Sequence, residues 1–471
     1  MDEFSIGRHL AKQVGGAGLR WFGVAGVALL AAGCTMIPKY ERPASPVPSQ
    51  YPGSPATNQT DAADIAWRSF FAEDRLQRLI EAALTNNRDL RVAILNVEQS
   101  QAQYHVARSA LLPTVDGNAS YTRAYASGRT ADVWSAGLGS TAYEVDLWGR
   151  VRSLNKQALE NYFATAEGQR NAQISLVAEV ANMYYQLRQA EEQIELARQT
   201  LAAVQESYKL NKATFDAGAS DELDLRTAEG QVQTAKINLI VYQRQLALSQ
   251  DALVLLLGES IPAELPNRRS FNDTNLLAEV PAGLPSELIQ RRPDILQAEY
   301  TLKAANANIG AARAAFFPAI TLTANVGSAS SELSRLFSGG TGVWNFSPQI
   351  SLPIFTGGRN KANLESAKVG KRIEVASYEK AIQTAFREVS DALASKETYA
   401  EQIKEEQILI VAQQRRFDLA TARYRQGQDS YLNVLSAQED LYTAQQDLLQ
   451  AQRNQLVSQI SLYKALGGGW K

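Results

Sequence analysis

Residues that bind metals are scarce in this chain of 471 residues, which contains one cysteine, three methionines and two histidines. Protein-built zinc, copper and iron sites depend largely on these side chains. We therefore predict no metal site and no cofactor. The sequence also contains no recognisable nucleophile–base set, phosphate-binding loop or metal cluster, so we do not expect an enzyme.

An excess of positive charge is missing as well. The chain has 47 Lys and Arg residues against 49 Asp and Glu residues, which gives a formal net charge of −2. Domains that bind nucleic acids usually carry a strong basic excess. We therefore predict no nucleic-acid partner.

Apolar runs long enough to form a transmembrane helix are also absent. The longest, WFGVAGVALLAA at 21–32, follows three basic residues and ends in LLAAGC. It is shorter than the roughly 20 residues that span a bilayer, so it predicts a signal peptide at 1–33. Small residues before a cysteine resemble a bacterial lipoprotein cleavage box, which predicts acylation of Cys34. A free buried cysteine, or cleavage nearby, is the alternative. Any part beyond Cys34 that spans a membrane must consist of strands.

Prolines are absent between Pro113 and Pro262 and after Pro353, whereas six of them fall within 38–55. The proline-rich stretch predicts an extended segment at 34–62. The proline-free stretch at about 150–217 has a helical 3-4 spacing and predicts a helix roughly 100 Å long at 1.5 Å per residue. The positions with this spacing are Ile194, Ala197, Leu201, Val204, Tyr208, Asn211 and Phe215.

A turn should follow at DAGASDEL, 216–223. Gly218 suits the position after a helix end, and Ser220 or Asp221 can cap a second helix at about 221–257. The same arrangement recurs: a helix at about 358–425, a turn at RQGQDSYL with Gly427, and a returning helix at about 429–466.

Two copies of one unit therefore make up the chain. Ile403, Ile410, Phe417 and Tyr424 follow Ile194, Leu201, Tyr208 and Phe215 by 209 residues, and FFPAI at 316–320 follows LLPTV at 111–115 by 205. The predicted order is repeat 1 at 63–258, a linker at 259–290, repeat 2 at 291–467 and a tail at 468–471.

Each copy should also contain two strands, because apolar and small polar residues alternate at about 114–123, 133–145, 318–327 and 343–353. A loop rich in Gly, Ser and Arg is predicted at 123–132, between the first two strands. This alternation is typical of outer-membrane strands, although an amphipathic sheet on a soluble core gives the same pattern. Four strands cannot close a barrel, whereas three chains would supply twelve. Aromatic residues next to the loops predict a girdle at the outer membrane interface: Tyr121, Trp134, Trp344 and Phe346.

Five segments of the chain carry a resemblance to a known family: WRSFFAEDRLQRLIEAALTNNRDL (67–90), YEVDLWGR (143–150), LPSELIQRRPDILQAEYTLKAANANIGAARAAFFPAITL (284–322), LPIFTGGRN (352–360) and LYKALGGGW (462–470). They resemble the outer-membrane factor family, and within it the lipoprotein branch that serves resistance-nodulation-division efflux pumps. The resemblance implies a mainly α fold with a small β part. Three chains would form a twelve-stranded transmembrane β-barrel above a tunnel of long antiparallel coiled helices, with a belt built from the linker and the chain ends.

The resemblance also implies a gate at the helix tips. Asp224 and Tyr424 match one gate pairing of the family, and Asp429 matches an acidic-ring position. Some members place a basic residue at the position of Asp429 and acidic residues at Asn433 and Ser436. For Ser220, Asp221 and Asp429, simple helix capping is the alternative role. The tips, marked by Gly218, Ser220 and Gly427, would dock a periplasmic membrane-fusion adaptor.

The function implied is that of an exit duct in the outer membrane. A homotrimer, lipid-anchored and projecting far into the periplasm, would pass small toxic compounds such as drugs from the adaptor and a resistance-nodulation-division pump to the exterior. An exit duct for type I protein secretion is an alternative. A periplasmic adaptor is a second alternative, but it would have one helical hairpin, whereas this chain predicts two.

Overall fold

The computed structural model describes residues 35–51, 65–267, 277–280 and 291–470. The predicted signal peptide and Cys34 lie outside these residues, as do parts of the extended segment and the linker. The described chain divides into two compact units. Unit 1 is built from residues up to 44, 96–166 and 297–378, and unit 2 from 45–95, 167–296 and 379–471.

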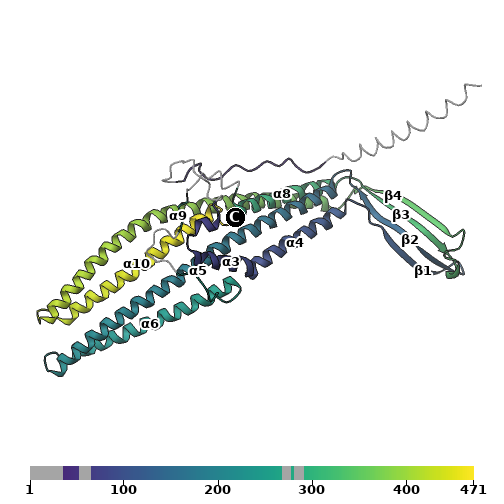
Figure 1. Cartoon of the computed structure of the whole chain (residues 1–471). Helices are drawn as coiled ribbons and strands as arrows, with labels where there is room; N and C mark the ends of the chain where they lie inside the picture. The colour runs from purple at the N-terminus through teal and green to yellow at the C-terminus, as the bar shows by residue number, and fades with distance from the viewer. Residues whose placement is uncertain (1–34, 52–64, 268–276, 281–290, 471) are drawn as a thin grey trace, which may run out of the picture. The chain divides into compact units, whose positions relative to one another are not determined.

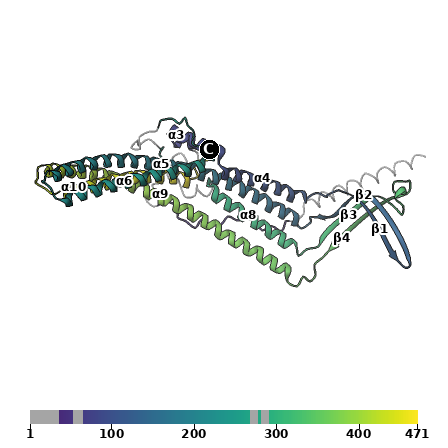
Figure 2. The ribbon, with the colours of Figure 1, turned by 90° about the horizontal axis from the view of Figure 1, so that it is seen from below.

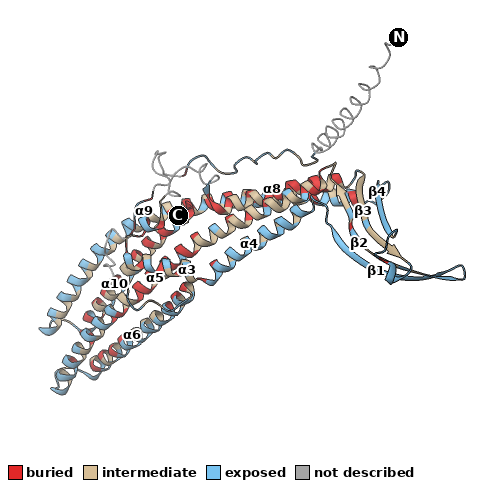
Figure 3. Ribbon diagram, turned by 45° about the vertical axis from the view of Figure 1, so that its right-hand side comes forward, coloured by how far each residue is buried: buried red, intermediate tan, exposed pale blue. Residues whose placement is uncertain are grey.

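Unit 1 contains a four-stranded antiparallel sheet with the order β1-β2-β3-β4, so each strand pairs with its sequence neighbour and β1 and β4 form the two edges (Figure 1). The residues of both edge strands are exposed along their whole length (Figure 3). The strands are β1 (Asp116–Ala126), β2 (Arg129–Val145), β3 (Ala319–Ser330) and β4 (Gly342–Ser351).

The hairpin between β1 and β2 is tighter than the sequence predicts. The Gly-, Ser- and Arg-rich stretch at 123–132 was expected to be a loop, but the turn consists of Ser127 and Gly128 alone, both with positive φ. Positive φ at both residues is typical of two-residue hairpin turns. Arg123 and Asp132 face each other across the strands and form an ion pair of 2.6 Å, so these charged residues continue the ladder.

Most of the described chain is helical. Two helices are much longer than the rest, α5 and α9, and each contributes residues to both units. None of the described helices has the length and apolar character needed to cross a membrane. The helices are α2 (Trp67–Phe70), α3 (Asp74–Asn86), α4 (Arg88–Ser109), α5 (Arg150–Asp216), α6 (Glu222–Leu257), α8 (Pro293–Ala314), the short 3₁₀ helix η2 (Leu333–Arg335), α9 (Arg359–Arg425) and α10 (Tyr431–Ala465).

The core of unit 2 is built around α5 and α10. Tyr463 of α10 stacks on Phe70 at 4.0 Å between ring centroids and donates a hydrogen bond to the carbonyl of Ile65. Nearby, Tyr184 of α5 donates a 2.6 Å hydrogen bond to the buried carboxylate of Glu73. These contacts fix the N-terminal helices of unit 2 onto its long helices. The buried carboxylate is compensated there by this hydrogen bond and by the guanidinium of Arg188, which lies 3.4 Å from it.

An extended N-terminal segment packs along α8 in unit 1. The guanidinium of Arg42 forms a 2.8 Å ion pair with the buried Glu299. Asn306 donates a hydrogen bond to the carbonyl of Pro38. Gly310 leaves the space that Ile37 fills, because a Cβ at this position would lie 2.6 Å from the Ile37 side chain. The segment is therefore held in one register on the helix.

Candidate functional site

Two tip turns connect the long helices of unit 2, α5 to α6 at 217–221 and α9 to α10 at 426–430, and they lie at the same end of the two hairpins (Figures 1 and 2). Gly218 and Gly427 have φ values of 72° and 70°. The amide of Ala219 donates to the carbonyl of Thr214 at 2.9 Å, and the amide of Gln428 donates to that of Arg423 at 3.0 Å. Both helices thus end in the same Schellman motif, which needs glycine for its left-handed residue.

The residues after the two glycines differ in their roles. Asp221 is the N-cap of α6, and its carboxylate accepts a 2.9 Å hydrogen bond from the amide of Asp224. Ser220 does not cap the helix, because its hydroxyl group instead shares a 3.2 Å hydrogen bond with Thr214. The N-cap of α10 is Ser430, whose side chain makes no capping bond. Capping therefore accounts for Asp221 but not for Ser220 or Asp429.

A polar cluster joins the two hairpins just behind the tip turns. Asn211 of α5 is fully buried, and its amide oxygen accepts a 2.6 Å hydrogen bond from the hydroxyl group of Tyr424 on α9. Tyr431 of α10 shares a 3.0 Å hydrogen bond with Ser207 of α5. Apolar side chains surround the cluster: Tyr208, Ala228, Phe417, Ala420, Val434 and Leu435.

Within one chain, the hydroxyl proton of Tyr424 is directed to Asn211. The gate pairing of Tyr424 with Asp224 that the family resemblance implies stays a prediction. The Asp224 carboxylate is close enough to Tyr424 to act electrostatically. Burial raises the pKa of Tyr424, and the negative charge of Asp224 raises it further. Burial also raises the pKa of Asp224 itself, with a smaller contribution from Asp221.

The surroundings of Asp429 lower its pKa, whereas those of Asp224 raise the pKa of that residue. Oδ1 of Asp429 accepts hydrogen bonds from the side chain of Asn433 at 2.5 Å and from the amide of Ser430 at 2.9 Å, and its Oδ2 pairs with Arg423 at 3.4 Å. The hydrogen bond from Asn433 is the main cause of a lowered pKa for Asp429, followed by the Ser430 amide. Asp429 is therefore a fixed negative charge at neutral pH.

A groove of about 470 Å³ runs beside Asp429 between α9 and α10. Three arginines line it, and one of them, Arg416, is paired with Asp440 across the two helices. The groove combines positive charge with a short apolar strip. Its lining residues are Ala412, Arg415, Arg416, Leu419, Ala420, Arg423, Asp429 and Asn433.

The predicted girdle residues all lie on one face of the unit 1 sheet, as the strand register shows. Tyr121 pairs with Trp134, and the rings stack at 4.3 Å, which places both within the ladder instead of at its end. Trp134 pairs with Ser330 of β3, and Trp344 pairs with Val326 of the same strand. Since 326 and 330 share a parity, all of these side chains point to the same face, together with Phe346 opposite Ala324.

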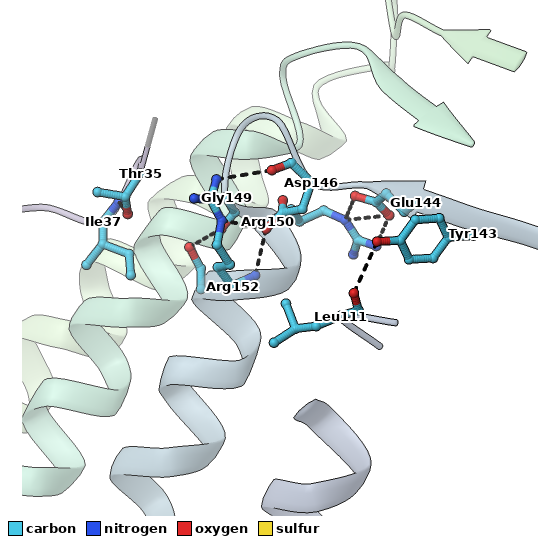
Figure 4. A network of polar contacts seen from close by, with 10 residues as sticks. Thr35, Ile37, Leu111, Tyr143, Glu144, Asp146, Gly149, Arg150 and Arg152 are labelled. Carbon is cyan, nitrogen blue, oxygen red and sulfur yellow. Dashed lines mark hydrogen bonds and ion pairs between the residues drawn. The ribbon is translucent and has the colours of Figure 1, made fainter. Parts of the chain in front are cut away.

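The ends of the strands meet the helices of unit 1 at a set of turns that we call the joint: 110–115, 146–149, 315–318 and 352–358. Arg150 pairs with Glu144, and Arg152 pairs with Asp146 through both its amide and its guanidinium (Figure 4). Tyr143 donates a 3.1 Å hydrogen bond to the carbonyl of Leu111 (Figure 4). These bonds fix the angle at which β2 becomes α5.

Trp148 links the β2–α5 turn of the joint to the α8–β3 turn. Its ring stacks on Phe317 with centroids 4.7 Å apart, and its indole N–H donates a 3.0 Å hydrogen bond to the carbonyl of Pro318. The sequence motifs YEVDLWGR and FFPAI contain these residues, but their contact could not be read from either motif. Sequence reasoning likewise missed Asn211, whose only signal was a polar residue at an apolar position of the helical spacing.

Comparison with known proteins agrees with this architecture. The model of the outer membrane efflux protein family matches residues 79–259 and again 284–468, so the two copies are tandem repeats. The probable efflux pump outer membrane protein TtgC of Pseudomonas putida is 48% identical over 457 residues, 94% of each chain. The cation efflux system protein CusC of Escherichia coli is 40% identical over 453 residues, 94% of this chain and 98% of that protein.

Solved structures show the same likeness. The open state of the MtrE outer membrane channel of Neisseria gonorrhoeae superposes with a TM-score of 0.86 at 40% identity, covering 93% of this chain and 99% of that one. The chain belongs to the outer membrane efflux protein family.

Proposed function

We propose that this chain is the outer-membrane exit duct of a tripartite efflux pump. The observation that carries the proposal is the 48% identity, over almost the full length of both chains, to efflux pump outer membrane proteins. In this role the protein passes compounds from an inner-membrane pump and a periplasmic adaptor to the exterior and catalyses no reaction. The pump is of the resistance-nodulation-division type.

The duct is a homotrimer in this proposal. The sheet of unit 1 has free edges at β1 and β4, and strand edges are not tolerated in lipid. Three copies that pair β4 of one with β1 of the next close a ring of twelve strands. The aromatic face of the sheet, with Tyr121, Trp134, Trp344 and Phe346, would then meet the membrane, and the face with Thr321, Thr323 and Asn325 would line the water-filled channel.

The tip turns form the periplasmic gate. Tyr424 and Asn211 tie α9 to α5, so this hydrogen bond supports a closed arrangement of the two hairpins. Asp429 supplies a negative charge beside the turn, and three copies around an axis would form an acidic ring that favours cations. Asp224 lies behind the turn as a partly buried carboxylate that is poorly stabilised.

The adaptor docks at the same tips. The arginine-lined groove between α9 and α10 offers positive charge next to the apolar side chains of Leu419 and Ala420. A helical hairpin of an adaptor could place an amphipathic face there, with acidic residues opposite Arg415 and Arg423. Gly218 and Gly427 keep the turns compact enough for such an approach.

The N-terminus is anchored by acylation at Cys34. The segment that follows this residue supports the assignment, because it is fixed to unit 1 from its first described residues: Arg313 donates a 3.3 Å hydrogen bond to the carbonyl of Met36, close to the start of β3. An acyl chain on residue 34 would thus enter the membrane near the joint.

Deletion of the gene tests the function. Susceptibility should rise for a panel that includes antibiotics, toluene and metal cations, since relatives are named for antibiotic, toluene and cation efflux. Plasmid-borne wild type should restore resistance, and purified protein should form channels in planar bilayers. Unchanged susceptibility to every compound, together with loss of secretion of a protein, would instead identify a type I secretion duct.

A further inference from the structure

Two turns of the joint expose large apolar side chains to an unusual degree. In the turn between β4 and α9, Ile354 and Phe355 are 91% and 90% exposed. In the turn between α4 and β1, Leu112 and Val115 are both 70% exposed. These turns belong to the two edge strands of the sheet, so each has a neighbour on one side only.

The other two turns of the joint show how a neighbouring turn covers apolar side chains of this kind. Trp148, in the turn between β2 and α5, covers Phe317 and bonds to Pro318, in the turn between α8 and β3. Phe317 is 37% exposed, compared with 70% for Leu112. The contact of Trp148 with Phe317 joins the end of β2, which runs toward the joint, to the start of β3, which runs away from it.

The tandem repeat relates the two pairs of turns. LLPTV and FFPAI correspond at an offset of 205 residues, so Leu112 and Pro113 occupy the places of Phe317 and Pro318. The turn before Arg359 corresponds to the turn before Arg150, and both end in a glycine with positive φ, Gly358 and Gly149. The turn between β4 and α9 is thus the counterpart of the turn that contains Trp148.

Because β1 and β4 are the two edges of the sheet, the β4–α9 turn can meet an α4–β1 turn only between two chains. β4 ends at the joint and β1 begins there, so β4 of one copy and β1 of the next are antiparallel with their joint ends adjacent. Within one chain, Asn360 at the start of α9 donates a 2.8 Å hydrogen bond to the carbonyl of Ala315, which fixes the β4–α9 turn against the α8–β3 turn. In the proposed trimer, the opposite side of the β4–α9 turn would face the next copy.

We propose that Ile354 and Phe355 of one copy pack on Leu112, Pro113 and Val115 of the next copy, and that this contact closes the trimer at the joint. The inference rests on the homotrimer of the proposed function. Phe355 takes the role of Trp148, because position 357, which corresponds to Trp148, is a glycine. Burying such large apolar side chains removes their surface from water and thereby stabilises the contact between copies.

Cysteine cross-linking in the full-length protein tests the contact directly. The only natural cysteine is Cys34, so the double variant Leu112→Cys/Phe355→Cys adds a defined pair of thiols. Oxidation, or a short bismaleimide where the Cα atoms lie beyond disulfide range, should convert monomers into covalent dimers and trimers on denaturing gels. Each single variant and the pair Leu112→Cys/Phe337→Cys serve as controls. Phe337 is 81% exposed but lies in the β3–β4 loop at the opposite end of the strands.

The outcomes separate the inference from the proposed function. Intact, conducting trimers without cross-links at Leu112 and Phe355 would overturn the contact and leave the duct in place. The same result, with Phe355→Cys reacting only with lipid-soluble maleimides, would assign this turn to the membrane. Absence of any trimer for the wild type would overturn the duct itself.

A charge substitution gives a second measurement that does not need added cysteines. Phe355→Asp should lower the temperature at which the trimer dissociates in detergent, because it places a carboxylate in an apolar contact between copies. Phe337→Asp makes the same change at a comparably exposed residue and should leave that temperature unchanged. Equal temperatures for the two variants would contradict the contact.

Discussion

The hydroxyl group of Tyr424 donates a 2.6 Å hydrogen bond to the amide oxygen of the fully buried Asn211, and this bond joins α9 to α5 behind the tip turns. Tyr424→Phe removes the donor and leaves a buried acceptor unsatisfied, at a cost of about 1–3 kcal/mol. We expect the tips to separate more readily, so single-channel conductance in planar bilayers should rise. Tyr399→Phe on the same helix, outside the cluster, is the control. Equal conductance of the Tyr424→Phe variant and the wild type would show that this bond does not restrain the tips.

Removing the charge of Asp224 should not raise the conductance, in contrast to removing the hydroxyl group of Tyr424. Burial raises the pKa of Asp224, so the folded protein binds the proton more tightly than the unfolded chain does. Stability of the tip is therefore greatest at low pH and falls as the pH rises from the ordinary value of about 3.9 through the folded-state pKa. Asp224→Asn removes the unfavourable charge, and we expect conductance at pH 7 to stay at or below that of the wild type. An increase, as for Tyr424→Phe, would instead favour a direct gate pairing of Asp224 with Tyr424 in the trimer.

The tips also show which structural features can be predicted from the sequence and which cannot. Gly218 and Gly427 marked both turns because few other residues adopt positive φ easily. The partner of Tyr424 could not be predicted in the same way, since Asn211 lies 213 residues away and a helical spacing does not say which neighbouring helix a position faces. The prediction of a loop at 123–132 was wrong for a different reason. Its charged residues pair across the two strands of the hairpin, and this cross-strand pairing outweighs a local composition that is typical of loops.

Asp429 should set the ion selectivity of the channel. We expect Asp429→Ala trimers to conduct more and to be less cation-selective, because the carboxylate is ionised beside the turn. Asp429→Asn separates charge from hydrogen bonding, since its amide oxygen can still accept from Ser430 and Asn433. If charge is responsible, both variants should shift the reversal potential equally. Wild-type behaviour of Asp429→Asn would assign the effect of the alanine to the lost hydrogen bonds.

The pH dependence of that selectivity is a separate prediction. Hydrogen bonds from Asn433 and Ser430 hold the pKa of Asp429 below its usual value. A depressed carboxyl pKa keeps the charged form present above the ordinary value of about 3.9 and loses it only as the pH falls through the lower folded-state value. Cation selectivity, measured from reversal potentials, should therefore persist near pH 4. Asn433→Ala should raise the pH at which selectivity is lost, and an unchanged pH profile in this variant would exclude Asn433 as the main cause.

Glycine substitutions at the tips and within a helix should act in opposite directions. Gly427 has a φ of 70° in the Schellman motif, so Gly427→Ala places a β-carbon in the left-handed region at a cost of about 1–2 kcal/mol. Gly230 lies inside α6, where an added β-carbon would meet only open space, so Gly230→Ala should stabilise that helix by about 0.5–1 kcal/mol. Amide hydrogen exchange at 423–430 should become roughly five- to thirty-fold faster in the first variant. Exchange in α6 should slow in the second. Equal exchange of the tip in Gly427→Ala and the wild type would mean that the turn does not depend on its left-handed residue.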